Sequence, residues 1–277
     1  MDYPGFIGLG VMGEPMAQNL ISAGYKLPVF DIVPERMHHL TLRGATPCHS
    51  ARAVAASCSI LFLMVRDQRE IDTALFGEQG ATAGMRSGSI VVIMSSISAP
   101  AARQVARRLH EQGVSLLDAP VSGGREGAKA ATLTIMAGSE PKVFERVAPF
   151  LRCMGKNITH VGGVGSGQVA KAANQLIVAL TRAAIGEAIR MVVAEGIPAE
   201  RVLPALEGGA ADCASLRSYA PRMVAADDPV EFASPIIAKD MASIRARIHE
   251  LNLEMPFAEL VGRMYLEFGQ EPPPGRD

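Results

Sequence analysis

A glycine-rich segment near the N-terminus is the first feature with an evident chemical use. It reads Gly8-Leu9-Gly10-Val11-Met12-Gly13, which fits the spacing GxGxxG and stands between an apolar run and a helical pattern. In such a turn the first glycine permits a sharp bend, the second lets a pyrophosphate approach the backbone, and the third lets helix and strand pack closely. The N–H groups at the start of the following helix favour an anion. The segment therefore predicts a dinucleotide-binding turn.

An acidic residue at the end of the next apolar run supports the same prediction. Asp31 lies 18 residues beyond Gly13, where a carboxylate accepts hydrogen bonds from the adenosine ribose and repels a 2′-phosphate. No arginine is adjacent to it in the sequence, since Arg36 follows five residues later. This pattern favours NAD over NADP as the cofactor.

Three polar residues on an otherwise apolar helical stretch are the candidate catalytic group. Lys171, Asn174 and Gln175 stand at i, i+3 and i+4, so they project from one helix face. Polar side chains in such surroundings need partners or line a cavity. Desolvation there favours the neutral amine of Lys171, which is then able to accept a hydroxyl proton as a hydride leaves.

A serine followed by two glycines is the candidate anion-binding loop for the substrate. Ser122, Gly123 and Gly124 come shortly after an apolar run that ends at Asp118. In doubly wound folds this edge of the sheet binds ligands. A serine hydroxyl and exposed backbone N–H groups are able to hold a carboxylate, although a purely structural turn would use the same residues.

The elements that position these residues alternate in the first half of the chain. Short apolar runs are expected as strands: 3–8, 27–31, 59–65, 89–94 and 114–118, with 132–137 and 157–161 extending the sheet. Helical patterns between them include 14–23, 34–43 and 99–112. This alternation predicts an α/β fold of Rossmann type, with a doubly wound, mostly parallel sheet covered on both faces.

The second half has a different character. Residues 168–195 predict one helix of about 28 residues, roughly 42 Å long at 1.5 Å per residue. Shorter helices are expected at 199–207, 214–225, 235–251 and 256–268, and the proline-rich tail 271–277 is expected to hang free. We therefore predict a dinucleotide-binding domain over 1–162 and an all-helical domain over 163–277, hinged at the glycine cluster between them, with the active site in the cleft.

Composition and missing patterns exclude several other classes of protein. The net charge is −1 at pH 7, so no strong field gathers nucleic acid. The four cysteines form no CxxC pair, and no signal peptide or long apolar span is evident, so a cytoplasmic protein without membrane contact is expected. Neither a GxSxG elbow, a phosphate loop ending in GK[ST], nor a metal-ligand pattern is present, and no metal is expected.

Three motifs carry a resemblance to a known family. They are 12–24, which continues the glycine turn; 118–124, Asp-Ala-Pro-Val-Ser-Gly-Gly; and 165–175, Gly-Ser-Gly-Gln-Val-Ala-Lys-Ala-Ala-Asn-Gln. In their order and spacing they resemble the β-hydroxyacid dehydrogenases, and the resemblance covers nearly the whole chain. It implies that Lys171 is the catalytic lysine and Asn174 a substrate-binding residue. It also implies a homodimer or homotetramer.

The resemblance extends to less specific positions and includes departures. Ser122 and Gly123, with Gly124 beside them, match the loop that receives the substrate carboxylate. Four further positions match cofactor contacts of the family: Met64, Val65, Ser96 and Lys239. Three residues differ from those common in relatives: Gln175 replaces a second asparagine, Ile93 an acid, and Arg66 a proline. Gln175 leaves one substrate hydrogen bond open, and Arg66 changes the surroundings of the cofactor or substrate.

The expected function is oxidation of a small β-hydroxy acid by NAD, giving a semialdehyde or keto acid. One alternative is an NADP-linked reductase of glyoxylate, succinic semialdehyde or tartronate semialdehyde, against which Asp31 argues. Another is an imine reductase, against which Lys171 argues. A third is a non-catalytic NAD-binding sensor that has kept the fold.

Overall fold

The computed structural model describes residues 2–225 and 235–268. The chain divides into two compact units, Met1–Lys171 and Ala172–Asp277. Each unit has its own hydrophobic core. The predicted free tail, 271–277, lies outside the described residues.

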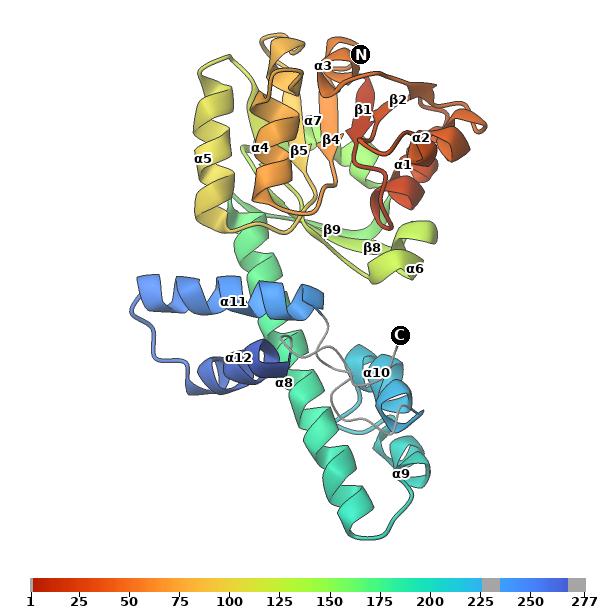
Figure 1. Cartoon of the computed structure of the whole chain (residues 1–277), viewed down its shortest axis with the longest axis vertical. Coiled ribbons are helices and arrows are strands. Elements are labelled where there is room, and N and C mark those ends of the chain that lie inside the picture. Colours follow the sequence, from red (N-terminus) through yellow and green to blue (C-terminus); the bar gives the residue numbers. More distant parts are fainter. Residues whose placement is uncertain (1, 226–234, 269–277) are drawn as a thin grey trace. The chain divides into compact units, whose positions relative to one another are not determined.

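A nine-stranded sheet forms the centre of the first unit (Figure 1). Its main path runs in the order β3-β2-β1-β4-β5-β6-β8-β7, and β9 pairs with β8. The strands are β1 Pro4–Ile7, β2 Pro28–Phe30, β3 Thr46–Pro47, β4 Ile60–Leu63, β5 Ile90–Ile93, β6 Ser115–Asp118, β7 Val121–Ser122, β8 Leu133–Gly138 and β9 Gly155–Gly162. From β3 to β6 every pair is parallel, whereas β8 is antiparallel to β6 and β7. The predicted α/β class with a mostly parallel sheet is confirmed.

Helices cover both faces of this sheet, which explains why its strands are continuously apolar. Alternate strand residues enter two different cores: Phe6 and Phe62 lie in one, and Ile7 and Leu63 in the other. The first core packs against helices that include α1 (Gly13–Ser22), α2 (Pro34–Thr41) and α7 (Pro141–Leu151). The second packs against α3 (Ala51–Ala56), α4 (Gln68–Phe76), the 3₁₀ turn η1 (Ala81–Ala83) and α5 (Ala99–His110).

Several short elements of this unit lack a signal strong enough to be predicted. Strands β3 and β7 have two residues each, and helices α3 and α6 (Gly124–Lys129) have six each. The segment expected as a loop at Ser122 is therefore partly a strand, because β7 pairs antiparallel with β8 and Ser122 stands opposite Thr134. Helix α6 begins directly afterwards at Gly124.

Within the described residues of the second unit, all the regular secondary structure is helical. Its helices are α8 Ser166–Ala194, which starts in the first unit, α9 Ala199–Leu206, α10 Ala214–Ala225, α11 Pro235–Glu250 and α12 Pro256–Phe268. The core joins α8, α11 and α12 through residues such as Ala179, Met241 and Tyr265. None of the helices within 2–225 and 235–268 combines the length and apolar character needed to span a membrane.

Candidate active site

The glycine turn between β1 and α1 has the geometry that a dinucleotide requires. Gly8 has a φ of +90°, and a Cβ there would overlap the backbone oxygen of Met64. A Cβ on Gly13 would overlap the backbone oxygen of Gly8, so these two glycines allow the turn and the helix to pack together. At Gly10, by contrast, a Cβ would meet nothing within 4 Å. The open side of Gly10 leaves the backbone accessible to a ligand.

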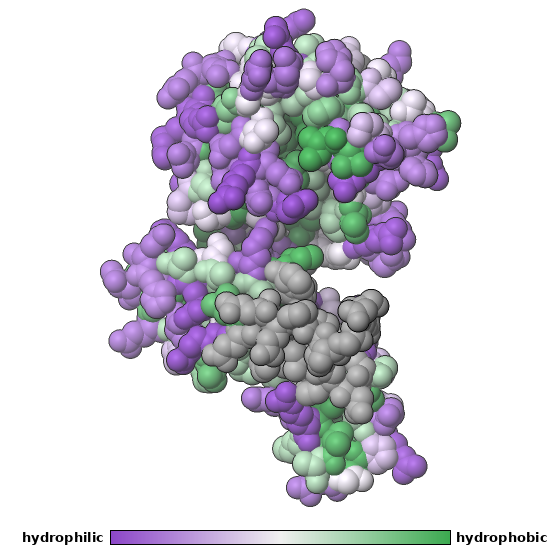
Figure 2. Space-filling view, viewed as in Figure 1, coloured by the Kyte–Doolittle hydropathy of each residue, from purple (hydrophilic) through white to green (hydrophobic). Residues whose placement is uncertain are grey.

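This turn lines an open cavity of about 640 Å³. The lining includes Gly8, Gly10, Val11, Met12, Gly13, Asp31, Met64 and Val65, all predicted as cofactor-binding residues. Hydrophobic residues show on the surface of this unit near the turn in Figure 2, and two of the lining residues, Val11 and Ile32, are 68% and 77% exposed. The predicted residue Leu9 is instead only 1% exposed and belongs to the core.

Asp31 follows β2 directly and is held in place by the backbone around it. Its carboxylate accepts hydrogen bonds from the N–H of Leu9 at 2.6 Å and of Val33 at 2.8 Å. It is only 5% exposed and forms part of the cavity wall. A carboxylate has about four acceptor positions, so it retains capacity for ribose hydroxyls.

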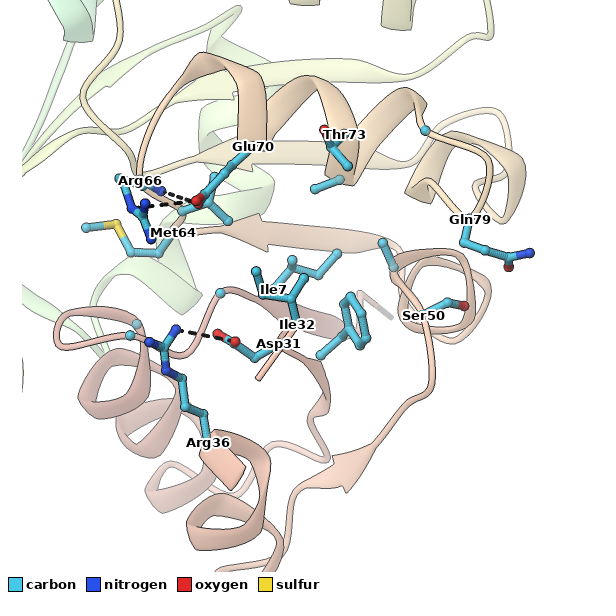
Figure 3. Close-up of a pocket in the computed structure, with 18 of the residues that line it drawn as sticks. Ile7, Asp31, Ile32, Arg36, Ser50, Met64, Arg66, Glu70, Thr73 and Gln79 are labelled. Atoms are coloured by element: carbon cyan, nitrogen blue, oxygen red, sulfur yellow. Dashed lines mark hydrogen bonds and ion pairs between the residues drawn. The ribbon is translucent and has the colours of Figure 1, made fainter. Parts of the chain in front are cut away.

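The expectation that no arginine stands beside Asp31 is wrong in three dimensions. Helix α2 begins at Pro34, and its first turn brings the Arg36 side chain back to the strand end. Nη1 of Arg36 lies 3.4 Å from Oδ1 of Asp31, and the Arg36 side chain is 47% exposed. Arg36 and Asp31 are five residues apart in the sequence but form a direct ion pair at the cavity wall (Figure 3).

A second ion pair, between Arg66 and Glu70, lies on the other side of the cavity in Figure 3. Arg66 follows Val65, and its backbone N–H donates to Oε2 of Glu70 at 2.8 Å. Its Nε lies 3.6 Å from Oε1 of the same glutamate. The arginine that replaces the family's proline therefore contributes to the cavity that the glycine turn lines.

Further lining residues were missed by sequence reasoning. His49, Ser50, Thr73, Glu78 and Gln79 lie in the wall, on or near the short segments around α3 and α4. Ser50 has a structural role as well, because its hydroxyl accepts the N–H of Ala53 and caps α3. These positions have no motif; only the fold brings them to the cavity.

Lys171 lies in the second turn of α8 and is 8% exposed. The start of this helix meets Asp118, which ends β6 and is fully buried. Oδ1 of Asp118 accepts the N–H of Gly165 at 2.6 Å, and Oδ2 accepts that of Gln168 at 2.8 Å. Burial raises the pKa of the Asp118 carboxyl, and the backbone hydrogen bonds partly oppose that rise.

The Gln168 side chain connects α8 to the end of β5. Its Oε1 accepts the N–H of Ile97 at 3.1 Å, and its Nε2 donates to the backbone oxygen of Ser95 at 2.9 Å. The Ser95 hydroxyl accepts the N–H of Val65 at 2.9 Å and donates to its oxygen at 2.8 Å. The neighbouring Ser96, which was the predicted cofactor contact, is half-buried and is absent from the lining of the cavity.

The predicted carboxylate loop starts at the end of a strand. Ser122 is half-buried in β7, and Gly123 and Gly124 have φ values of +128° and +60°. A left-handed backbone of this kind favours glycine. The two glycines turn the chain from β7 into α6 and are themselves exposed.

The other predicted substrate residues belong to the second unit. Nδ2 of Asn174 donates to Oε1 of Gln175 at 2.9 Å, and Nε2 of Gln175 donates to Oδ2 of Asp240 at 2.6 Å. Asp240, on α11, is 8% exposed, whereas its neighbour Lys239 is exposed. Gln175 therefore orients Asn174 and joins α8 to α11. Asp240 is its partner on α11, a role that the position of Asp240 beside Lys239 in the sequence does not indicate.

Comparison with known proteins agrees with this arrangement. Residues 4–162 match the family model for the NAD-binding domain of 6-phosphogluconate dehydrogenase, and residues 165–277 match that for the NAD-binding domain of NADP-dependent 3-hydroxyisobutyrate dehydrogenase. The chain is 43% identical over 252 residues to 2-hydroxy-3-oxopropionate reductase of Escherichia coli, covering 91% of this chain and 86% of that protein.

Two further relatives carry the name of one enzyme. Mitochondrial 3-hydroxyisobutyrate dehydrogenase of Drosophila melanogaster is 32% identical over 268 residues, covering 94% of this chain and 82% of that protein. The structure of Mycobacterium tuberculosis 3-hydroxyisobutyrate dehydrogenase with L-serine has a TM-score of 0.85 at 27% identity, covering 97% of this chain and 94% of that one.

The fold and the glycine-lined cavity define a nicotinamide-dinucleotide-dependent oxidoreductase. The chain belongs to the β-hydroxyacid dehydrogenase family, as its motifs predicted.

Proposed function

We propose that this enzyme interconverts a small β-hydroxy acid and the corresponding semialdehyde or keto acid, with Lys171 exchanging the hydroxyl proton. The observation that carries the proposal is that one unit holds both the dinucleotide cavity and a buried lysine at the start of α8. Relatives named as reductases and dehydrogenases of hydroxy acids support the reaction class.

The cavity wall fits a nicotinamide dinucleotide. The unobstructed face of Gly10 is where a pyrophosphate would approach, and Asp31 would accept the ribose hydroxyls. Met12, Met64 and Val65 would give apolar contacts along the cofactor. When bound, the nicotinamide ring supplies the acceptor or donor of the hydride.

The residues of the chain would manage the proton and the carboxylate. In oxidation, the neutral amine of Lys171 accepts the hydroxyl proton as the carbon loses its hydride and the C–O bond becomes a carbonyl. Ser122 and the N–H groups of Gly123 and Gly124 would hold the substrate carboxylate, and Asn174 would hold its hydroxyl. In reduction Lys171 returns the proton, so the same groups serve both directions.

For the cofactor we propose NAD, with Asp31 as the residue that selects it. Its negative charge opposes a 2′-phosphate, and its ion pair with Arg36 uses part of the arginine's positive charge. Arg36 is still half exposed at the cavity wall, which favours a preference for NAD over an absolute requirement.

The proposal for the substrate rests on the chemical groups that the site would bind and on similarity to named relatives. The 43% identical relative is named for 2-hydroxy-3-oxopropionate, which carries a carboxylate beside a hydroxylated carbon and an aldehyde. Reduction of such a semialdehyde is therefore a second candidate for the physiological direction, alongside oxidation of 3-hydroxyisobutyrate or L-serine.

For the cellular form we propose a cytoplasmic homodimer or homotetramer, with residues 1–162 serving cofactor binding and 163–277 serving substrate binding and assembly. Exposed apolar side chains on α8, among them Ile177 and Met191, each 65% exposed, support an assembly surface.

A substrate panel tests the reaction class. Initial rates at 340 nm would be measured with 3-hydroxyisobutyrate, L-serine, D-glycerate, threonate and 3-hydroxypropionate, and in reverse with tartronate semialdehyde, each with both cofactors. We expect turnover of at least one of these acids or its semialdehyde, with a higher kcat/KM for NAD or NADH. Tight NADH binding without turnover in either direction would overturn the proposal in favour of a cofactor-sensing protein.

A further inference from the structure

The start of α8 is fixed to the sheet by side chains that have no assigned role in the reaction. These are Asp118, Gln168 and Ser95, here called the α8 anchor, which are respectively 0%, 3% and 1% exposed. All three lie in the first unit together with Lys171 and the dinucleotide cavity. Polar side chains buried this deeply need partners, and each of these has them.

The carboxylate of Asp118 binds the N-terminal end of α8. It accepts two backbone N–H groups there, from Gly165 and Gln168, at 2.6 and 2.8 Å. The backbone packs closely around this carboxylate, because a Cβ on Gly138 would lie 2.6 Å from Oδ1 of Asp118 and one on Gly167 would lie 2.8 Å from Oδ2. These contacts therefore fix the position of the first turn of α8 along the helix axis and its rotation about that axis.

Gln168 fixes the same turn to the cofactor side. It needs both halves of its amide, because Oε1 accepts from Ile97 and Nε2 donates to Ser95. The Ser95 hydroxyl then makes two hydrogen bonds with the backbone of Val65, which lines the cavity. A continuous chain of hydrogen bonds thus runs from the cavity wall to the helix that carries Lys171, three residues beyond Gln168.

We propose that Asp118 and Gln168 are positioning residues that hold Lys171 in register with the bound cofactor. The inference rests on the proposed role of Lys171. Asp118 also ends the strand that leads to Ser122, so the anchor joins the substrate segment, the cofactor segment and the catalytic helix. A misplacement of about 1 Å at a reacting group is able to cost roughly 100-fold in rate.

Gln168→Met tests this proposal, because methionine keeps the length of the side chain and removes both hydrogen bonds. Gln112→Met, at an exposed position, makes the same chemical change away from the anchor. We expect kcat of the Gln168 variant to fall roughly 10- to 100-fold, while the dissociation constant of NADH stays within about twofold. Asp118→Asn replaces one accepting oxygen by an NH2 group that faces a backbone N–H. We expect this variant to lower kcat as well.

Two readouts separate positioning from a general loss of folded enzyme. The isotope effect on kcat with substrate deuterated at the reacting carbon should rise, because hydride transfer becomes slower relative to product release. Hydrogen exchange should accelerate in the peptide covering 166–176 and stay unchanged elsewhere. The control variant Gln112→Met should change neither the isotope effect on kcat nor the hydrogen exchange of this peptide.

Other results would overturn the inference. They are an unchanged kcat, a lower kcat without a rise in the isotope effect, a proportional loss of NADH binding, or unchanged exchange at 166–176. Failure of the proposed function is distinguishable. If the wild-type protein turned over no substrate, the reaction class would fail, whereas the exchange measurement would still decide whether Gln168 anchors α8.

Discussion

Gly10 and Gly13 stand in one turn but serve different purposes. Gly13 lets α1 pack against the backbone of Gly8, and a methyl group there would overlap it. Gly10 faces open space at the cavity. Its φ lies outside the left-handed region, so its small size serves the approach of a ligand.

Alanine substitutions at these two positions should therefore change different properties, NADH affinity at Gly10 and fold stability at Gly13. Gly10→Ala is expected to keep the wild-type melting temperature and to weaken NADH binding by roughly tenfold, since one methyl group blocks the phosphate path. Gly13→Ala is expected to destabilise the fold by about 1–3 kcal/mol through overpacking. Thermal melts and NADH fluorescence titrations check both, and unchanged NADH affinity of Gly10→Ala would contradict the assignment.

Cofactor choice is also decided at the scale of single residues. Asp31→Asn removes a negative charge facing the ribose and frees Arg36 from its ion pair. Because like charges placed together cost free energy, the change should raise the ratio of kcat/KM for NADP to that for NAD by roughly tenfold or more. Asp72→Asn, in an exposed ion pair with Arg108, is the control. An unaltered ratio would show that Asp31 does not select the cofactor.

At this scale the sequence predicts motifs well and spatial neighbours poorly. The sequence predicts the glycine turn, Asp31, Met64 and Val65 as cofactor-binding, and in the structure they line one cavity. Five residues separate Arg36 from Asp31 in the sequence, yet the turn of α2 brings the two side chains together. The motifs include Gln168 and Asp118 but do not reveal their contact, since partners 50 residues apart cannot be paired from sequence alone.

Among the elements, α12 contributes a buried phenol to the helical core. Tyr265 is 1% exposed, and its hydroxyl lies 3.5 Å from the backbone oxygen of Ala179 on α8. Burial raises the pKa of Tyr265 to about 12, against a value of about 10 for a tyrosine in an unfolded chain. The folded state therefore holds this proton more tightly than the unfolded state does.

Alkaline pH should consequently destabilise this core. The contribution of the protonated Tyr265 to the free energy of unfolding is fully present below a pH of about 10. It is lost as the pH rises through about 12. Tyr265→Phe should lose less stability than the wild type over this interval, as measured by denaturant midpoints at several pH values. Tyr3→Phe, at a 57% exposed position, should behave as the wild type. Identical pH dependence of all three proteins would contradict this account.

Element prediction succeeded where hydrophobic patterns are long. The strands around Phe6, Phe62 and Val92 and the long helix α8 are periodic or continuously apolar, so their existence follows from the sequence. The two-residue strands β3 and β7 and the six-residue helices α3 and α6 carry too few residues for any periodicity. Pairing within the sheet, rather than local pattern, places Ser122 in a strand.

For the whole molecule, the exposed apolar residues of α8 predict self-association. Apolar side chains that gather on one exposed element mark an interaction surface, and a second copy is able to bury them. The double variant Ile177→Lys, Met191→Lys should therefore lower the mass found by light scattering towards that of a monomer. Leu42→Lys places the same charge at a 74% exposed residue of the first unit and should leave the mass unchanged. A monomeric wild-type protein would contradict the proposed assembly.

In the proposed nicotinamide-dependent reaction of a hydroxy acid, Lys171 exchanges the hydroxyl proton. The most direct test compares Lys171→Ala with the wild type on the best substrate of the panel, with NADH affinity measured on the same samples. We predict a loss of kcat of roughly 10²- to 10⁴-fold, the range for removal of a general acid–base, with NADH affinity retained. A variant that keeps wild-type kcat would contradict the account.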